Sequence, residues 1–132
     1  MTLAPSAIFP VHKPLVELIK NHNVTKIYTN YVNGPVADAV SKGHLKELLV
    51  MDTHGGRPRA IESGELKIDV AFIGVPNSDF NGNGNGIEGP SACGSLGYCI
   101  SDMKYAKHKI VITDYISQVI DPIEIEAKYI DY

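Results

Sequence analysis

The segment Ile68-Asp-Val-Ala-Phe-Ile-Gly74 constrains the fold more than any other part of the chain. Its near-continuous apolar run predicts a strand buried on both faces, as is typical of parallel sheets covered by helices. Short apolar segments alternate with short helical patterns elsewhere, which indicates an α/β protein with a layered, mainly parallel sheet flanked by helices. The other strands are expected over Leu3–Phe9, Val24–Thr29, Leu48–Met51 and Lys109–Thr113.

Helices are expected where apolar residues recur at helical spacing. The first follows Pro14 and ends near Asn21, and the second spans Pro35–Lys42 and stops at Gly43. Two more are predicted over Pro58–Ser63 and inside Gly94–Ala106.

The two ends of the chain show strand patterns without flanking turns. The final segment, Ile123–Tyr132, alternates apolar and polar residues, which predicts a strand with one solvated face at an antiparallel edge. The first predicted strand begins at once, at Leu3. Natural domains usually have looser ends. We therefore expect a single α/β domain over residues 1–132 that is truncated at both ends.

Composition argues against several classes of protein. A net charge of −3 does not suit a general nucleic-acid binder, which needs a basic surface. No apolar run approaches the roughly 18 residues that cross a membrane, and the first residues lack the features of a signal peptide. The five histidines and two cysteines show no metal-site spacing, so no bound metal is expected. Free thiols at Cys93 and Cys99 indicate a reducing, cytoplasmic location.

Three loops have the composition of ligand-binding loops, and α/β sheets bind ligands beyond the carboxyl ends of their strands. The first loop is Thr53-His-Gly-Gly-Arg-Pro-Arg59. Its glycines let backbone N–H groups approach a ligand, and Arg57 and Arg59 beside a helix start suit a carboxylate or phosphate. A tight turn with two solvated arginines explains the same residues equally well, so both interpretations stay open.

The second loop, Pro76–Gly86, ends in the repeat Asn81-Gly-Asn-Gly-Asn-Gly86. Asn and Gly tolerate positive φ, so successive N–H groups could form an anion-binding nest. Asp79 would either cap its own loop or hold a substrate hydroxyl. An EF-hand calcium loop does not fit, because Glu88 is not at the required last position. An ordinary surface loop remains the alternative.

The third loop, Gly89–Tyr98, is rich in small residues. These permit close approach of the backbone to a ligand, or of a helix to the sheet. Cys93 could act as a nucleophile, but no histidine lies near it in sequence, and buried inert cysteines are commoner. Composition and spacing alone thus indicate an α/β domain with one anion-binding face and name no substrate.

Four segments in these loops and the adjoining strand resemble the citrate lyase alpha-subunit family. They are Thr53-His-Gly-Gly-Arg-Pro-Arg-Ala-Ile61, Ile68-Asp-Val-Ala-Phe-Ile-Gly74, Ser78-Asp-Phe-Asn-Gly-Asn-Gly-Asn-Gly86 and Cys93-Gly-Ser-Leu-Gly-Tyr98. Their shared order is more specific than any one of them. The resemblance covers nearly all of this chain but only a fraction of the family's longer protein, which would make the chain part of its N-terminal domain.

The resemblance implies a fold of the CoA-transferase type, Rossmann-like in its layers, and the activity of a citrate CoA-transferase. Such an enzyme exchanges acetyl for citryl on the thiol of an acyl-carrier subunit. The carrier's CoA-derived prosthetic group supplies the thioester, so no cofactor is expected on the chain itself. The implied partners are citrate, an acetyl thioester, and the acyl-carrier and lyase subunits, within an oligomer.

The resemblance also implies a set of site residues. The candidate catalytic groups, N–H donors to the thioester oxygen, are those of Gly55, Gly56, Gly82 and Asn83. The candidate substrate- and anion-binding residues are His54, Arg57, Arg59, Asp79, Asn85, Gly86 and Ser95. The alternative is a non-catalytic domain that docks the acyl-carrier or lyase subunit. A sugar-phosphate isomerase of similar architecture fits less well, because no obvious acid–base pair adjoins these loops.

Overall fold

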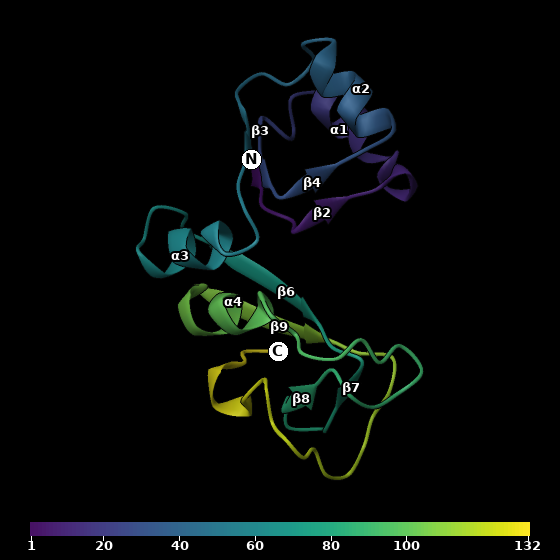
Figure 1. Ribbon diagram of the computed structural model, residues 1–132, viewed down its shortest axis with the longest axis vertical. Coiled ribbons are helices and arrows are strands. Elements are labelled where there is room, and N and C mark those ends of the chain that lie inside the picture. The colour runs from purple at the N-terminus through teal and green to yellow at the C-terminus, as the bar shows by residue number, and fades with distance from the viewer. The chain divides into compact units, whose positions relative to one another are not determined.

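Parallel strand pairs alternate with short helices in the computed structural model, which describes residues 1–132 (Figure 1). The predicted α/β class, with mainly parallel strands flanked by helices, is confirmed. The chain divides into two compact units, Met1–Arg57 and Pro58–Tyr132. A single domain over the whole chain therefore stays a prediction. None of the helices combines the length and the apolar character needed to cross a bilayer.

The first unit contains two small parallel sheets and two helices. In one sheet β3 (Lys26–Thr29) lies between β1 (Thr2–Leu3) and β5 (Leu49–Met51). In the other, β2 (Ala7–Ile8) pairs with β4 (Tyr31–Val32). The connections are a 3₁₀ turn, η1 (Pro10–His12), and two helices, α1 (Leu15–Lys20) and α2 (Pro35–Ser41).

The core of the first unit is aliphatic. Its fully buried side chains come from both helices, from both sheets and from the segment that connects α1 to β3. They are Ile8, Ile19, Val24, Ile27 and Val36. Leu15, Val16 and Ile19 recur at helical spacing, so α1 presents one apolar face to this core. The helices predicted to end near Asn21 and Gly43 are confirmed to within two residues.

The predicted continuous strand Leu3–Phe9 is wrong. It forms two short strands that pair with different partners, β1 with β3 and β2 with β4. The chain bends at Ser6, whose carbonyl accepts the Asn30 N–H at 3.0 Å and the Thr29 hydroxyl at 3.2 Å. The segment that pairs with it also bends, at Asn30 between β3 and β4, so the single expected strand pair becomes two.

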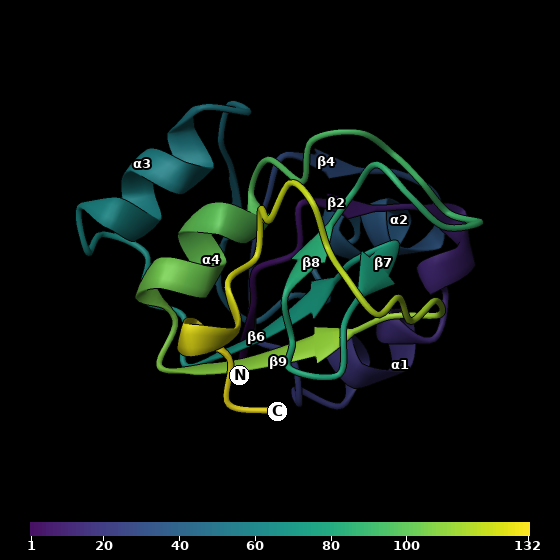
Figure 2. The same cartoon turned by 90° about the horizontal axis from the view of Figure 1, so that it is seen from below.

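The second unit is built on a parallel pair, β6 (Val70–Gly74) and β9 (His108–Ile112), with α4 (Cys99–Tyr105) lying along it (Figure 2). An antiparallel hairpin, β7 (Asn77–Ser78) with β8 (Gly84–Asn85), follows β6. The remaining elements are α3 (Gly56–Glu62), which continues from the end of the first unit, and η2 (Ala127–Tyr129). The core side chains are Ala71, Ile73, Val75, Met103, Ala106 and Ile125.

Burial of β6 on both faces is a prediction that the structure contradicts. Ala71 and Ile73 are buried, but the alternate side chains of Val70 and Phe72 are 46% and 69% exposed. A strand directs successive side chains to opposite faces, and within this chain α4 and the C-terminal segment around Ile125 cover only one of them.

The strand predicted over Ile123–Tyr132 is also absent. This segment makes one isolated antiparallel bridge, between Ile125 and Gly84, and then the 3₁₀ helix η2. Ile125 is fully buried in the core of the second unit. The tail is therefore held without a continuous ladder, by burial of Ile125 and by hydrogen bonds to β9 such as that from the Asp131 N–H to the Lys109 carbonyl at 2.9 Å.

Candidate functional site

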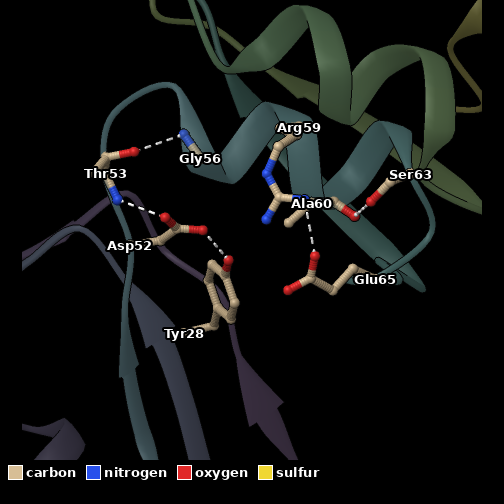
Figure 3. A network of polar contacts seen from close by, with 8 residues as sticks. All are labelled: Tyr28, Asp52, Thr53, Gly56, Arg59, Ala60, Ser63 and Glu65. Atoms are coloured by element: carbon tan, nitrogen blue, oxygen red, sulfur yellow. Dashed lines mark hydrogen bonds and ion pairs between the residues drawn. The ribbon is translucent and has the colours of Figure 1, made fainter.

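A tight turn, Thr53–Gly56, connects β5 to α3 (Figure 3). The hydroxyl of Thr53 accepts the Gly56 N–H at 3.0 Å, and its carbonyl accepts the Gly56 and Arg57 N–H groups at 3.1 and 3.3 Å. Thr53 thereby satisfies the first N–H groups of the helix. Because of this, α3 begins at Gly56 and not at the predicted Pro58, which lies in the first turn where a missing N–H costs nothing.

Two residues that the sequence analysis missed hold this turn. Asp52 follows β5, and its carboxylate accepts the Thr53 N–H at 2.7 Å and the hydroxyl of Tyr28 from β3. An ideal Cβ on Gly56 would stand 1.9 Å from Asp52 Oδ1, so any larger residue here would displace the Asp52 carboxylate. Tyr28 pairs with Val50 in the parallel ladder, which places Asp52, two residues further on, beside the tyrosine on one face. Only the strand register reveals this pair.

The four predicted N–H donors differ in what they contact. The Gly56 N–H donates to Thr53, the Gly82 N–H to the Asp79 carbonyl at 3.2 Å, and the Asn83 N–H to Asp79 Oδ1 at 3.0 Å. Gly55 is exposed, its N–H has no acceptor within the chain, and a Cβ there would meet no atom within 4 Å. Gly55 is therefore the predicted donor that the fold leaves accessible to a ligand; the roles of all four stay predictions.

The two arginines predicted beside one anion have different surroundings. Arg57 is 4% exposed. The Arg59 guanidinium lies 3.0 Å from Glu65 Oε2, with more than half of each side chain exposed. An exposed ion pair contributes little free energy, so Arg59 can exchange Glu65 for another carboxylate at small cost. His54 is exposed on the turn.

Asp79 organises the β7–β8 hairpin. Its Oδ1 accepts the N–H groups of Asn81 and Asn83 at 2.9 and 3.0 Å, and its Oδ2 accepts the Asn83 side-chain amide at 2.8 Å. Desolvation by burial raises the pKa of Asp79, but hydrogen bonds from Asn83, Asn81 and Gly82 together outweigh it and lower the pKa below its usual value. Capping of its own loop, one of the two predicted roles, is thus observed, whereas contact with a substrate stays a prediction.

Gly86 joins the second and third loops within the second unit. Its carbonyl accepts the N–H groups of Cys93 and Gly94 at 2.8 and 3.0 Å. Its own N–H donates to Glu124 Oε2 at 3.0 Å, and Glu124 Oε1 accepts the Leu96 N–H at 3.3 Å. A Cβ on Gly86 would stand 1.8 Å from the Gly94 carbonyl oxygen. The two loops pack as one assembly for this reason.

The remaining candidates divide into buried and exposed groups. Asn85 is fully buried; its Nδ2 donates to the Pro122 carbonyl at 3.0 Å and its Oδ1 accepts the Ile87 N–H at 3.3 Å. Ser95 is exposed. Cys93 carries an exposed free thiol, which contradicts its interpretation as a buried cysteine. No group of three or more His, Cys, Asp or Glu side chains is arranged to hold a metal ion.

Known proteins resemble this chain along its whole length. The family model described as "Citrate lyase, alpha subunit (CitF)" matches residues 1–132. Citrate lyase alpha chains from Haemophilus influenzae and Escherichia coli are 46% and 45% identical over 132 residues, which is 99% of this chain and 26% of each relative. A crystal structure of the citrate lyase alpha subunit from Streptococcus mutans in complex with citrate matches with a TM-score of 0.93 at 42% identity, over 99% of this chain and 26% of that one. The chain spans about a quarter of the length of these relatives.

Proposed function

The chain belongs to the citrate lyase alpha-subunit family, and from this premise we propose that its full-length protein is the citrate CoA-transferase component of citrate lyase. In the proposed reaction a citrate carboxylate attacks the carbonyl of an acetyl thioester on an acyl carrier. The C–S bond breaks, leaving an acetyl–citryl anhydride and a carrier thiolate. The thiolate then attacks the citryl carbonyl, the anhydride C–O bond breaks, and acetate leaves.

This chemistry asks the protein mainly for position and for hydrogen-bond donors. Citrate is already ionised, so little general-base work is needed, whereas charge develops on the thioester oxygen during attack. The observation that carries the proposal is the exposed Gly55 N–H, on a turn that Thr53 and Asp52 hold in place. The Streptococcus mutans relative, which contains citrate, supports citrate as the anion.

The proposal also includes the partner subunits and the cellular location of this reaction. The thioester would be borne by the CoA-derived group of an acyl-carrier subunit, and the lyase subunit would cleave the citryl product within one oligomer. The names of the relatives, which are citrate lyase chains, support such a complex. The free thiols of Cys93 and Cys99 support a reducing, cytoplasmic location.

The test compares two substitutions of Gly55 in the full-length protein. Gly55→Ala keeps the N–H and meets no atom within 4 Å, so we expect transfer from acetylated carrier to citrate to change little. Gly55→Pro removes the N–H, and we expect kcat to fall by about two orders of magnitude, as for loss of one oxyanion donor. Equal activities of the two variants would remove the Gly55 N–H from the mechanism.

The wild-type protein decides the proposal as a whole. Transfer to citrate by the full-length enzyme is the expected result. A full-length protein that binds the acetylated carrier and transfers nothing would instead support the non-catalytic docking domain.

A further inference from the structure

We propose that Asn30 is a positioning residue for the citrate-binding turn, acting through the carbonyl groups of Asp52 and Thr53. The inference rests on the proposed function for the assignment of this turn to citrate. Asn30 follows β3, and no sequence motif in the chain includes it. Its side-chain amide donates to the Asp52 carbonyl at 2.8 Å and to the Thr53 carbonyl at 2.7 Å.

These two hydrogen bonds lie where β5 ends and the turn begins. In an extended strand, successive carbonyl groups point to opposite sides, so one amide cannot hold two in a row. The last main-chain bond between the strands runs from the Asp52 N–H to the Thr29 carbonyl at 3.1 Å. One residue further on, the side chain of Asn30 takes over as donor and turns both carbonyls toward β3.

The direction of these carbonyls sets the direction of the N–H groups behind them. A peptide group is planar and trans, so its C=O and N–H point in opposite directions. The Asp52 carbonyl directs the Thr53 N–H away from Asn30, where it donates to the Asp52 carboxylate at 2.7 Å. The Thr53 carbonyl likewise directs the His54 N–H away from Asn30. Asn30 thereby fixes the two peptide groups that directly precede the His54–Gly55 peptide, whose N–H is the exposed donor.

Asn30 is well held for this task. Its main-chain N–H donates to the Ser6 carbonyl at 3.0 Å, so its backbone position does not depend on its side chain. Its Oδ1 is buried without a hydrogen-bond partner. Such a buried acceptor is unfavourable, and the two short bonds donated by Nδ2 are the contacts that offset it. Both hydrogen bonds between this side chain and the turn are therefore donated by Asn30.

The test compares Asn30→Ala with Asn33→Ala in the full-length enzyme. Asn33 is the matched control, because its amide donates at 2.9 Å to the exposed Tyr31 hydroxyl and does not touch the turn. We expect Asn30→Ala to raise the KM for citrate about tenfold and to lower kcat by up to about tenfold, because the turn both positions the anion and carries the Gly55 N–H proposed as donor to the thioester oxygen. We also expect hydrogen exchange of amides 52–57 to accelerate about tenfold, through local opening. Asn33→Ala is expected to change neither.

Each outcome separates the inference from the proposed function. Unchanged exchange in the turn of Asn30→Ala would overturn the positioning role, whatever the activity. Faster exchange with an unchanged citrate KM would overturn the link between Asn30 and citrate. If the wild-type enzyme neither binds nor uses citrate, the proposed function and that link fail together, while the exchange data still decide whether Asn30 holds the turn. Should Asn30→Ala not fold, Asn30→Ser, with one shorter donor, is expected to give intermediate effects on KM and exchange, and wild-type values in it would contradict the proposal.

Discussion

The Thr53–Gly56 turn and the Asp79–Asn83 hairpin loop use similar residues to different effect. Both are glycine-containing loops with an aspartate beside them. In the hairpin loop, Asp79 accepts the N–H groups of Asn81 and Asn83, so the chain's own carboxylate fills the nest. In the turn, the Gly55 N–H stays exposed without an acceptor. Glycine-rich composition therefore predicts that an anion is bound, but not whether the anion is a ligand or a side chain.

The charges of the two units reinforce this difference. The first unit, residues 1–57, carries six lysines and arginines against four carboxylate side chains. The second unit, residues 58–132, carries six against eleven. An anionic substrate meets less repulsion near the first unit than near the second. The turn is therefore the better candidate for binding citrate, and the hairpin the better candidate for a structural role.

The largest expected effect on stability is that of Gly86→Ala, which disrupts the packing of the hairpin against the third loop. Its Cβ would stand 1.8 Å from a main-chain oxygen, that of Gly94, so backbone must move. We expect the free energy of unfolding to fall by about 3 kcal/mol in urea titrations of the full-length protein. Gly74→Ala is the control, because a Cβ there meets nothing within 4 Å. Equal losses in both variants would contradict this account of the close approach.

Gly56→Ala disrupts the Thr53–Gly56 turn. Its Cβ would stand 1.9 Å from Asp52 Oδ1, so the carboxylate must leave its bond with Tyr28. We expect a loss of about 2 kcal/mol, which is smaller because a side chain can move more easily than backbone. Citrate binding, measured by titration calorimetry, should weaken as well. Gly55→Ala should preserve both the stability and the citrate affinity. A weaker citrate affinity in that variant would contradict the different roles assigned to Gly55 and Gly56.

Asp79→Ala asks whether the hairpin aspartate is structural. Removal of the carboxylate leaves the N–H groups of Asn81 and Asn83 without their acceptor, so we expect a loss of about 2 kcal/mol in stability. The KM for citrate should stay within about twofold of wild type if Asp79 only caps its loop. Asp114→Ala, which removes an exposed carboxylate bonded to Ser91, is the control. A raised KM for citrate in Asp79→Ala, but not in Asp114→Ala, would indicate that Asp79 contacts the substrate.

A smaller effect is expected from pH. The pKa of Asp79 is lowered in the folded protein, so its stabilisation is complete above the unfolded value of about 4 and is lost as pH falls through the folded pKa. The stability difference between wild type and Asp79→Asn should therefore shrink as the pH is lowered from about 5 to about 2. Urea titrations at several pH values measure it. A difference that is constant over this range would contradict the lowered pKa.

Arg59→Ala should have the smallest effect on stability. The ion pair with Glu65 is largely exposed on both sides, so we expect a change of about 0.5 kcal/mol or less. Thermal unfolding of Arg59→Ala and of Glu65→Ala measures this. A loss several times larger would show that the pair braces α3 and is not available for exchange with a substrate carboxylate.

The sequence by itself determined the features that depend on neighbours a few residues away. Helical spacing of Leu15, Val16 and Ile19 predicted α1, and an apolar run predicted β6. The order of four segments along the chain predicted the family, which the comparisons confirm, whereas ligand binding at the glycine-rich loops stays a prediction. The helices and strands follow from local propensity and periodicity, which can be read without knowing the fold, and the family follows from the resemblance of the four segments.

Only the tertiary structure decided which groups meet. Tyr28 and Asp52 are 24 residues apart, and Asn30 and Asp52 are 22 apart, so strand register alone brings them together. The split of the first predicted strand and the loss of the last one have the same origin, because pairing partners and buried side chains far along the chain outweighed local alternation. Whether an N–H faces a ligand depends on such distant contacts, since a donor that already holds a side-chain acceptor is no longer available.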